Sequence, residues 1–150
     1  MSTYEQLKLE NQLCFPFYAI SRLITRQYQP HLDELGITYP QYLVLMVLWE
    51  NDHQAVNTIA QKLILNTNTV TPLLKRMQKM GIITKSKSNK DERKMIVSLT
   101  PYGLLLKDKA AHIPSKLIGV DDFKPEQLEK MQKFQKQLLS FLKAMQEEKE

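Results

Sequence analysis

The middle of the chain carries the pattern that most restricts how this 150-residue protein can fold. Residues 56–63 have the apolar spacing of a short helix, and about 67–80 that of a longer helix closed by Gly81. Residues 82–86 and 95–99 have the composition of two short strands around a polar turn. This order predicts a helix-rich unit with one small β-hairpin.

Two more helices are expected before this segment. Residues ~6–30 carry an apolar helical stripe, in which Pro16 either introduces a kink or marks the true first turn. A loop or short helix is expected at 31–35. Residues 38–50 begin with Thr38 as N-cap and are apolar almost all round, so this helix should be central and buried.

Positive charge concentrates in the middle of the chain. The net charge is +5, yet residues 62–94 hold nine Lys or Arg against Asp91 and Glu92, a local +7 that leaves −2 elsewhere. Such a segment is typical of a surface that binds a polyanion, although a solvated charged face gives the same count. Together with the order of elements, it predicts a winged helix-turn-helix that binds double-stranded DNA.

The side chains expected to contact DNA lie at the start of the second helix and in the hairpin turn. Short polar groups at a helix N-terminus reach base edges or phosphates, although they also suit a helix cap. In the turn, Arg93 suits the narrow minor groove, with Asp91 orienting it by an ion pair. The candidates are Asn66, Thr67, Thr69, Thr71, Lys75, Arg76, Lys90 and Arg93.

Helices at both ends of the chain are expected to pair two copies. Residues 101–117 and a final helix carry apolar residues, and the stripe of the final helix would be exposed in a monomer. We expect one domain over residues 1–150, mainly α with a small β-hairpin. In it, about 6–35 and 101–147 form dimerisation helices, and about 38–100 form the winged helix-turn-helix. A two-fold homodimer should then bind a palindromic operator.

Cys14 is the only cysteine, so no internal disulfide can form. The N-terminus has no stretch suited to a signal peptide and no apolar run approaches a membrane span, so we expect a cytoplasmic protein without membrane contact. The three histidines are too scattered to suggest a metal site, and no cofactor motif is found. A lone cysteine is commonly an apolar packing residue, but beside a DNA-binding module it suggests a sensor.

The run TVTPLLKRMQKMGIITKSKSNKDERKMIVSLTPYG resembles the DNA-binding core of MarR-family regulators. Two earlier segments, LENQLCFPFYAISR and GITYPQYLVLMVLWE, closely resemble the organic hydroperoxide sensors of that family (OhrR type) in their one-cysteine form. The resemblance covers about residues 7–120. It implies a transcriptional regulator, expected to be a repressor, that leaves its operator when an organic hydroperoxide oxidises Cys14.

The resemblance also implies which side chains surround the cysteine. In that branch two tyrosines hydrogen-bond to the cysteine and can come from the partner subunit, and by resemblance these are Tyr28 and Tyr39. Tyr18, four residues after Cys14, is a candidate for the same pocket. An apolar wall that favours organic peroxides is expected from Leu13, Phe17, Leu43 and Met46.

The sequence around Cys14 supplies no cation that would stabilise a thiolate. No Lys or Arg lies within four residues, and Glu10 acts in the opposite direction. Tertiary contacts must therefore stabilise the Cys14 thiolate, either through tyrosine hydroxyls or through the N-terminus of the helix that starts at Tyr39. Oxidation should first give a sulfenic acid. Without a second cysteine, we expect a mixed disulfide with a low-molecular-weight thiol, a sulfenamide or an over-oxidised cysteine.

Three other functions remain open from the residues alone. One is a MarR-type repressor induced by a small aromatic ligand, with Cys14 incidental. Another is a DNA-binding structural protein without an inducer. The third is a thiol peroxidase, for which no resolving cysteine or other catalytic motif is found. We therefore expect a regulator and not an enzyme.

Overall fold

A computed structural model describes residues 4–117 and 124–147 of the chain. The fold is mainly helical with a small antiparallel sheet, as predicted. Its backbone divides into two units, Met1–Ile113 and Pro114–Glu150. In the described residues, no helix is both long enough and apolar enough to cross a membrane.

Helix α1 (Phe15–Leu35) begins later than the sequence predicted. Cys14 occupies the N-cap position and Pro16 lies in the first turn, where its missing N–H leaves no hydrogen bond unmade. The preceding residues form two short 3-10 turns, η1 (Glu5–Leu7) and η2 (Leu9–Asn11), in place of the expected helix from about residue 6. Pro16 therefore marks the true start of the helix and not a kink.

The same helix also ends later than expected. Pro30 lies inside α1, and the residues expected as a loop or short helix at 31–35 continue it. Gly36 then ends the helix in the left-handed conformation (φ 68°), with its N–H donating to the Asp33 carbonyl. Gly36 therefore ends α1, because a residue without Cβ adopts the left-handed conformation without strain.

Helix α2 (Tyr39–Glu50) is the buried central helix that the sequence predicted. It begins in a capping box, in which the Thr38 N–H donates to Gln41 Oε1 at 2.9 Å. Helices α1, α3, α4 and α5 all pack against it. Its buried residues therefore lie on several faces: Gln41, Tyr42, Val44, Leu45, Val47 and Leu48.

The expected helix-turn-helix and hairpin follow in order. They are α3 (Val56–Leu63), α4 (Thr67–Lys79), β2 (Ile83–Lys87) and β3 (Met95–Leu99). A two-residue strand, β1 (Gln54–Ala55), was not predicted, and it pairs with β3 to give a three-stranded sheet in the order β1-β3-β2. A strand of two residues is too short to show an alternating sequence pattern, so β1 is recognised only from its pairing with β3.

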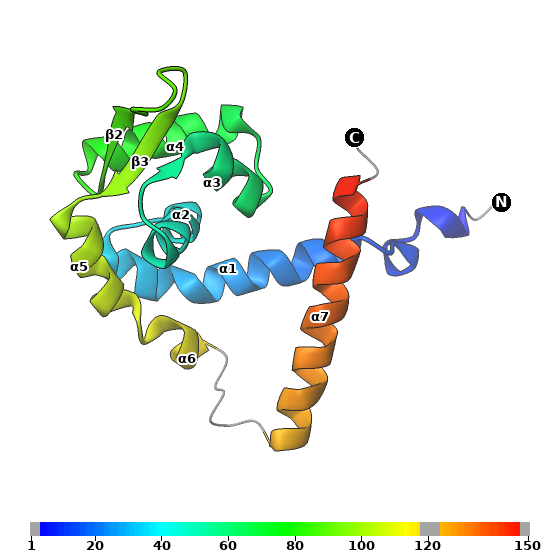
Figure 1. Cartoon of the computed structure of the whole chain (residues 1–150). Helices are drawn as coiled ribbons and strands as arrows, with labels where there is room; N and C mark the ends of the chain where they lie inside the picture. The colour runs from blue at the N-terminus through cyan, green and yellow to red at the C-terminus, as the bar shows by residue number, and fades with distance from the viewer. Residues whose placement is uncertain (1–3, 118–123, 148–150) are drawn as a thin grey trace. The chain divides into compact units, whose positions relative to one another are not determined.

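A single apolar core joins these elements. Figure 1 shows α3, α4 and the β2–β3 hairpin gathered on one side of α2, while the N-terminal half of α1 extends away from them. Helix α4 turns one face into this core and leaves the other face to solvent. The fully buried side chains include Leu45, Leu48, Ile59, Val70, Leu74, Met77, Ile82 and Val97.

The described residues of the C-terminal part, 101–117 and 124–147, form three helices where two were expected. The helix predicted over 101–117 is divided into α5 (Pro101–Ala110) and α6 (Ile113–Leu117). Helix α7 (Pro125–Glu147) follows, as predicted, and none of its residues is buried. The assignment of residues 1–150 to one domain with terminal dimerisation helices stays a prediction.

Candidate DNA interface and redox site

The start of α4 presents the polar side chains that the sequence selected for DNA. Asn66 occupies the N-cap position, but its side chain makes no capping hydrogen bond. Its carbonyl accepts from the N–H groups of Thr69 and Val70, so the backbone alone closes the first turn. The side chains of Thr67, Thr69 and Thr71 are exposed, as are Lys75 and Arg76 further along the helix.

The hairpin turn holds Arg93 by the ion pair that was predicted. Arg93 Nε lies 3.3 Å from Asp91 Oδ1, which also accepts from the Arg93 N–H at 3.1 Å. The Ser88 N–H donates to the Lys94 carbonyl at 2.8 Å and closes the base of the turn. At the tip, the Lys90 N–H donates to Ser88 Oγ, and the Arg93 side chain is 92% exposed. The guanidinium is therefore oriented yet free to enter a DNA groove.

A groove of about 470 Å³ separates α3 from the hairpin. Two predicted residues, Thr71 and Arg93, lie along it. Lys94, which belongs to the turn expected to bind DNA, lies along it as well. Sequence reasoning did not select the other polar residues of the groove, because α3 carries little charge and Lys85 lies within a strand. These are Asn57, Thr58, Gln61 and Lys85. Three cations beside short hydrogen-bonding side chains suit a phosphate of the DNA backbone.

Cys14 lies on the surface at the N-terminus of α1. The cysteine is exposed, which is the opposite of the apolar packing role that a lone cysteine commonly has. It lies at the positive end of the dipole of its own helix, which favours negative charge. The sequence analysis had instead suggested that the N-terminus of the helix starting at Tyr39 stabilises the thiolate. Leu13 and Phe17 beside it are 83% and 49% exposed.

Three tyrosines form an aromatic cluster between α1 and α2. The ring centroids of Tyr28 and Tyr39 are 4.9 Å apart, and Tyr42 lies 5.8 Å and 6.3 Å from them. Tyr42 was not a sequence candidate, although its place one helical turn after Tyr39 is a usable signal. Burial raises the pKa of all three tyrosine hydroxyls. Repulsion from neighbouring phenolates raises the pKa of Tyr28 and Tyr42 further. The hydroxyls therefore stay protonated and can donate hydrogen bonds at neutral pH.

Within one chain, this cluster lies far from the cysteine. Cys14 and Tyr28 are separated by 14 positions along α1, which corresponds to about 21 Å at 1.5 Å per residue. Tyr18 is closer to Cys14 but is exposed, and its hydroxyl accepts from Arg22 Nη1 at 3.5 Å. A single copy therefore does not bring Tyr28 and Tyr39 to Cys14.

The expected apolar wall is also open in a single copy. Phe17 on α1 is 49% exposed, Met46 on α2 is 38% exposed, and Leu43 is half-buried. Phe17 lies 11 positions before Tyr28, or about 17 Å along the helix. These side chains enclose a peroxide only if another surface covers them.

The packing of α3, α4 and the hairpin defines the class of the protein, which is a winged helix-turn-helix regulator. Residues 26–110 match the family described as "Transcriptional regulator SarA/Rot". The chain belongs to this family of MarR-like winged-helix transcriptional regulators.

Similar proteins bear out the resemblance seen in the sequence. The organic hydroperoxide resistance transcriptional regulator of Bacillus subtilis is 48% identical over 128 residues, covering 85% of this chain and 87% of that protein. SarZ of Staphylococcus aureus is 34% identical over 115 residues, covering 77% of this chain and 78% of SarZ. A structure of reduced AbfR bound to DNA superposes with a TM-score of 0.75 at 35% identity, covering 93% and 97% of the two chains. The first two relatives are named as transcriptional regulators and AbfR was solved on DNA, which favours the expected regulator over the thiol peroxidase alternative.

Proposed function

We propose that this protein is a peroxide-responsive regulator that binds a palindromic operator as a homodimer and leaves it when Cys14 is oxidised. The observation that carries this proposal is the exposed Cys14 at one end of α1, with a cluster of protonated tyrosines towards the other end. The similar regulator of Bacillus subtilis is named for organic hydroperoxide resistance. AbfR has been solved reduced on DNA and in a disulfide form, and its overoxidised form has also been solved on DNA. We therefore assign release to the sulfenic acid or mixed disulfide of Cys14 and not to its over-oxidation.

A second copy of the chain would complete the redox site. The N-terminal half of α1 exposes an apolar surface that a monomer would leave in water. If two α1 helices cross antiparallel near Ser21, Cys14 of one copy lies opposite Tyr28 of the other, because the two positions are equally far from Ser21. The same crossing covers the apolar side chains of Leu13, Phe15, Phe17, Ile20, Leu23 and Ile24.

The chemistry follows from a thiolate held by donors. Cys14 Sγ attacks the distal oxygen of the hydroperoxide, the O–O bond breaks, and an S–O bond forms. The leaving alkoxide takes a proton and departs as an alcohol, and the cysteine becomes a sulfenic acid. A low-molecular-weight thiol can then condense with it, forming a disulfide and releasing water. Both products lack the thiolate to which Tyr28 and Tyr39 would donate.

Operator release follows from the geometry of a two-fold dimer. Each α4 would enter the major groove with its polar start, while Arg93 reaches the minor groove and the basic groove holds a phosphate. Two half-sites on one face of DNA require a fixed distance between the two α4 helices. A shift of α1 and α2 after oxidation changes this distance and lowers affinity.

The test compares the wild-type protein with Cys14→Ser on DNA. The probe is a duplex selected from a randomised pool by the reduced wild-type protein, and binding is measured by fluorescence anisotropy. With one equivalent of cumene hydroperoxide, wild-type affinity should fall by at least about tenfold, while Cys14→Ser should be unchanged. Intact mass spectrometry confirms that one oxygen atom or one thiol has been added at Cys14. Release of Cys14→Ser by the peroxide would contradict the redox proposal.

A further inference from the structure

Trp49, the only tryptophan of the chain, joins the tyrosine cluster to α5. Its ring packs edge-on against Tyr42, with centroids 6.1 Å apart. Its indole Nε1 donates to the Gly103 carbonyl at 3.0 Å, and Lys107 Nζ donates to the Trp49 carbonyl at 3.0 Å. The end of α2 is therefore held to the first two turns of α5 by two hydrogen bonds.

Gly103 in turn touches the backbone that follows the recognition helix α4. A Cβ at this position would lie 2.2 Å from the Ile82 carbonyl oxygen, so α5 is in close contact with Ile82. The Gly103 N–H donates to Thr100 Oγ1 at 3.0 Å, and that hydroxyl donates to the Gly81 carbonyl at 2.6 Å. Since Gly81 follows Met80, the C-cap of α4, a movement of α5 is passed to that end of the helix.

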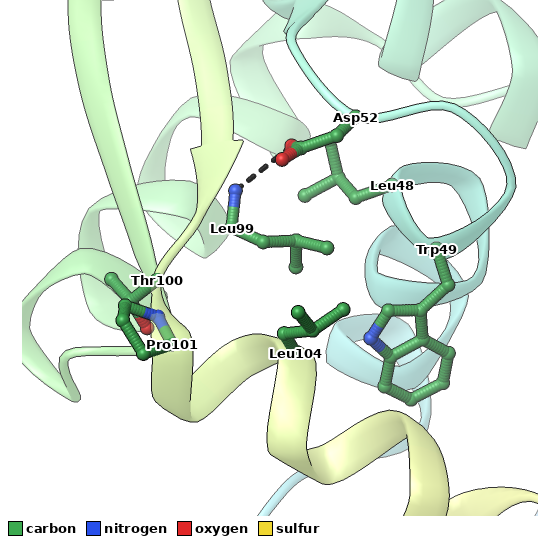
Figure 2. A pocket seen from close by; sticks show the side chains of 7 residues that line it. All are labelled: Leu48, Trp49, Asp52, Leu99, Thr100, Pro101 and Leu104. Carbon is green, nitrogen blue, oxygen red and sulfur yellow. Dashed lines mark hydrogen bonds between the residues drawn. The ribbon is translucent and has the colours of Figure 1, made fainter.

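A pocket beside this junction leaves room for such a movement. It has a volume of about 410 Å³ and lies between the end of α2, the end of β3 and the start of α5. Figure 2 shows Trp49 and Leu104 at one side of it and the Asp52–Leu99 hydrogen bond at another. On this side the start of α5 is not closely packed, and the hydrogen bonds of Trp49 hold it to α2.

We propose that Trp49 is a positioning residue that transmits the state of the tyrosine cluster to α4 through Gly103. This inference rests on the proposed function. When oxidation of Cys14 removes the acceptor of Tyr28 and Tyr39, their rings repack together with Tyr42. Trp49 moves with Tyr42, its bond to Gly103 is displaced, and α5 carries the end of α4 with it.

The first experiment uses the fluorescence of Trp49 in the intact wild-type dimer. Addition of one equivalent of cumene hydroperoxide should change the emission, because the indole N–H loses its partner and its surroundings change. The change should follow formation of the oxidised species seen by mass spectrometry, and Cys14→Ser should show none. Unchanged emission in protein that has lost its affinity for DNA would overturn the inference.

The second experiment uses Trp49→Phe, which keeps an aromatic ring and removes the donor. Reduced Trp49→Phe should bind the selected duplex within about threefold of wild type and form sulfenic acid at the wild-type rate. Its loss of affinity on oxidation should be smaller than that of wild type by about tenfold, within the usual range of coupling between sites. Tyr102→Phe is the matched control, because Tyr102 precedes Gly103 on α5 and its side chain is exposed.

The outcomes separate the two proposals. If wild type responds to peroxide and Trp49→Phe responds equally, the role of Trp49 is wrong and the proposed function stands. If wild type keeps its affinity after Cys14 is oxidised, the proposed function fails and this inference fails with it. If Trp49→Phe does not fold, the fluorescence of the wild-type protein decides.

Discussion

Replacing Gly103 with alanine tests the contact between α5 and the end of α4. In an open helix this change would stabilise the protein by about 0.5–1 kcal/mol, because alanine is the better helix former. At Gly103 the added Cβ would lie 2.2 Å from the Ile82 oxygen and 3.2 Å from Leu99 Cδ2. The Ile82 carbonyl cannot turn away freely, since it accepts from the Thr100 N–H at 3.1 Å.

The size of the effect follows from the movement that relieves this clash. Ordinary contact begins at 3.4 Å, so the start of α5 must retreat by roughly 1 Å. That movement breaks the Trp49–Gly103 and Thr100–Ile82 hydrogen bonds, each worth about 1 kcal/mol. Disturbed packing costs about 1–2 kcal/mol more. After the gain of about 0.5–1 kcal/mol in helix propensity is subtracted, the free energy of unfolding should fall by about 2–3.5 kcal/mol.

The assay is urea denaturation at a fixed protomer concentration, because the stability of the proposed dimer would depend on concentration. The midpoint temperature should also fall, by about 5–10 °C. Gly81→Ala is the comparison, since no atom lies within 4 Å of its added Cβ and only its positive φ of 71° opposes the change. It should cost about 1–2 kcal/mol. A Gly103→Ala protein as stable as wild type would refute the close contact between α5 and Ile82.

Two further predictions concern the DNA-binding surface and the tyrosines. Arg93→Ala should weaken binding of the selected duplex by about tenfold at moderate salt, measured by anisotropy, and unchanged affinity would show that the hairpin does not reach DNA. Burial raises the pKa of Tyr28, Tyr39 and Tyr42 above 10.0. The folded protein therefore keeps these protons after the unfolded chain has lost them, and stability should fall as pH rises from about 10 through the folded pKa values. Phenolate absorbance should show a late-titrating fraction that decreases in Tyr42→Phe.

Local sequence was sufficient for most of the fold. The apolar spacing of α3 and α4, Gly81 beyond the end of α4 and the polar turn between β2 and β3 each act within a few residues. Capping, turn conformation and the helical period are properties of neighbouring residues, and they can be read without knowing the rest of the molecule. The polar start of α4 and the Asp91–Arg93 pair were found for the same reason.

Tertiary structure decided what these elements do together. Whether Pro16 kinks α1 or begins it was decided by the preceding residues, which form two 3-10 turns and not a helix. Strand β1 exists only because β3 pairs with it. The path from Tyr42 through Trp49 to Gly103 joins residues up to 61 positions apart, and no local pattern reveals it. The sequence by itself determined a winged helix-turn-helix with one cysteine, because those features are local. The separation of Cys14 from Tyr28 within one chain was decided by α1, which runs as one helix from Phe15 to Leu35 in the folded chain.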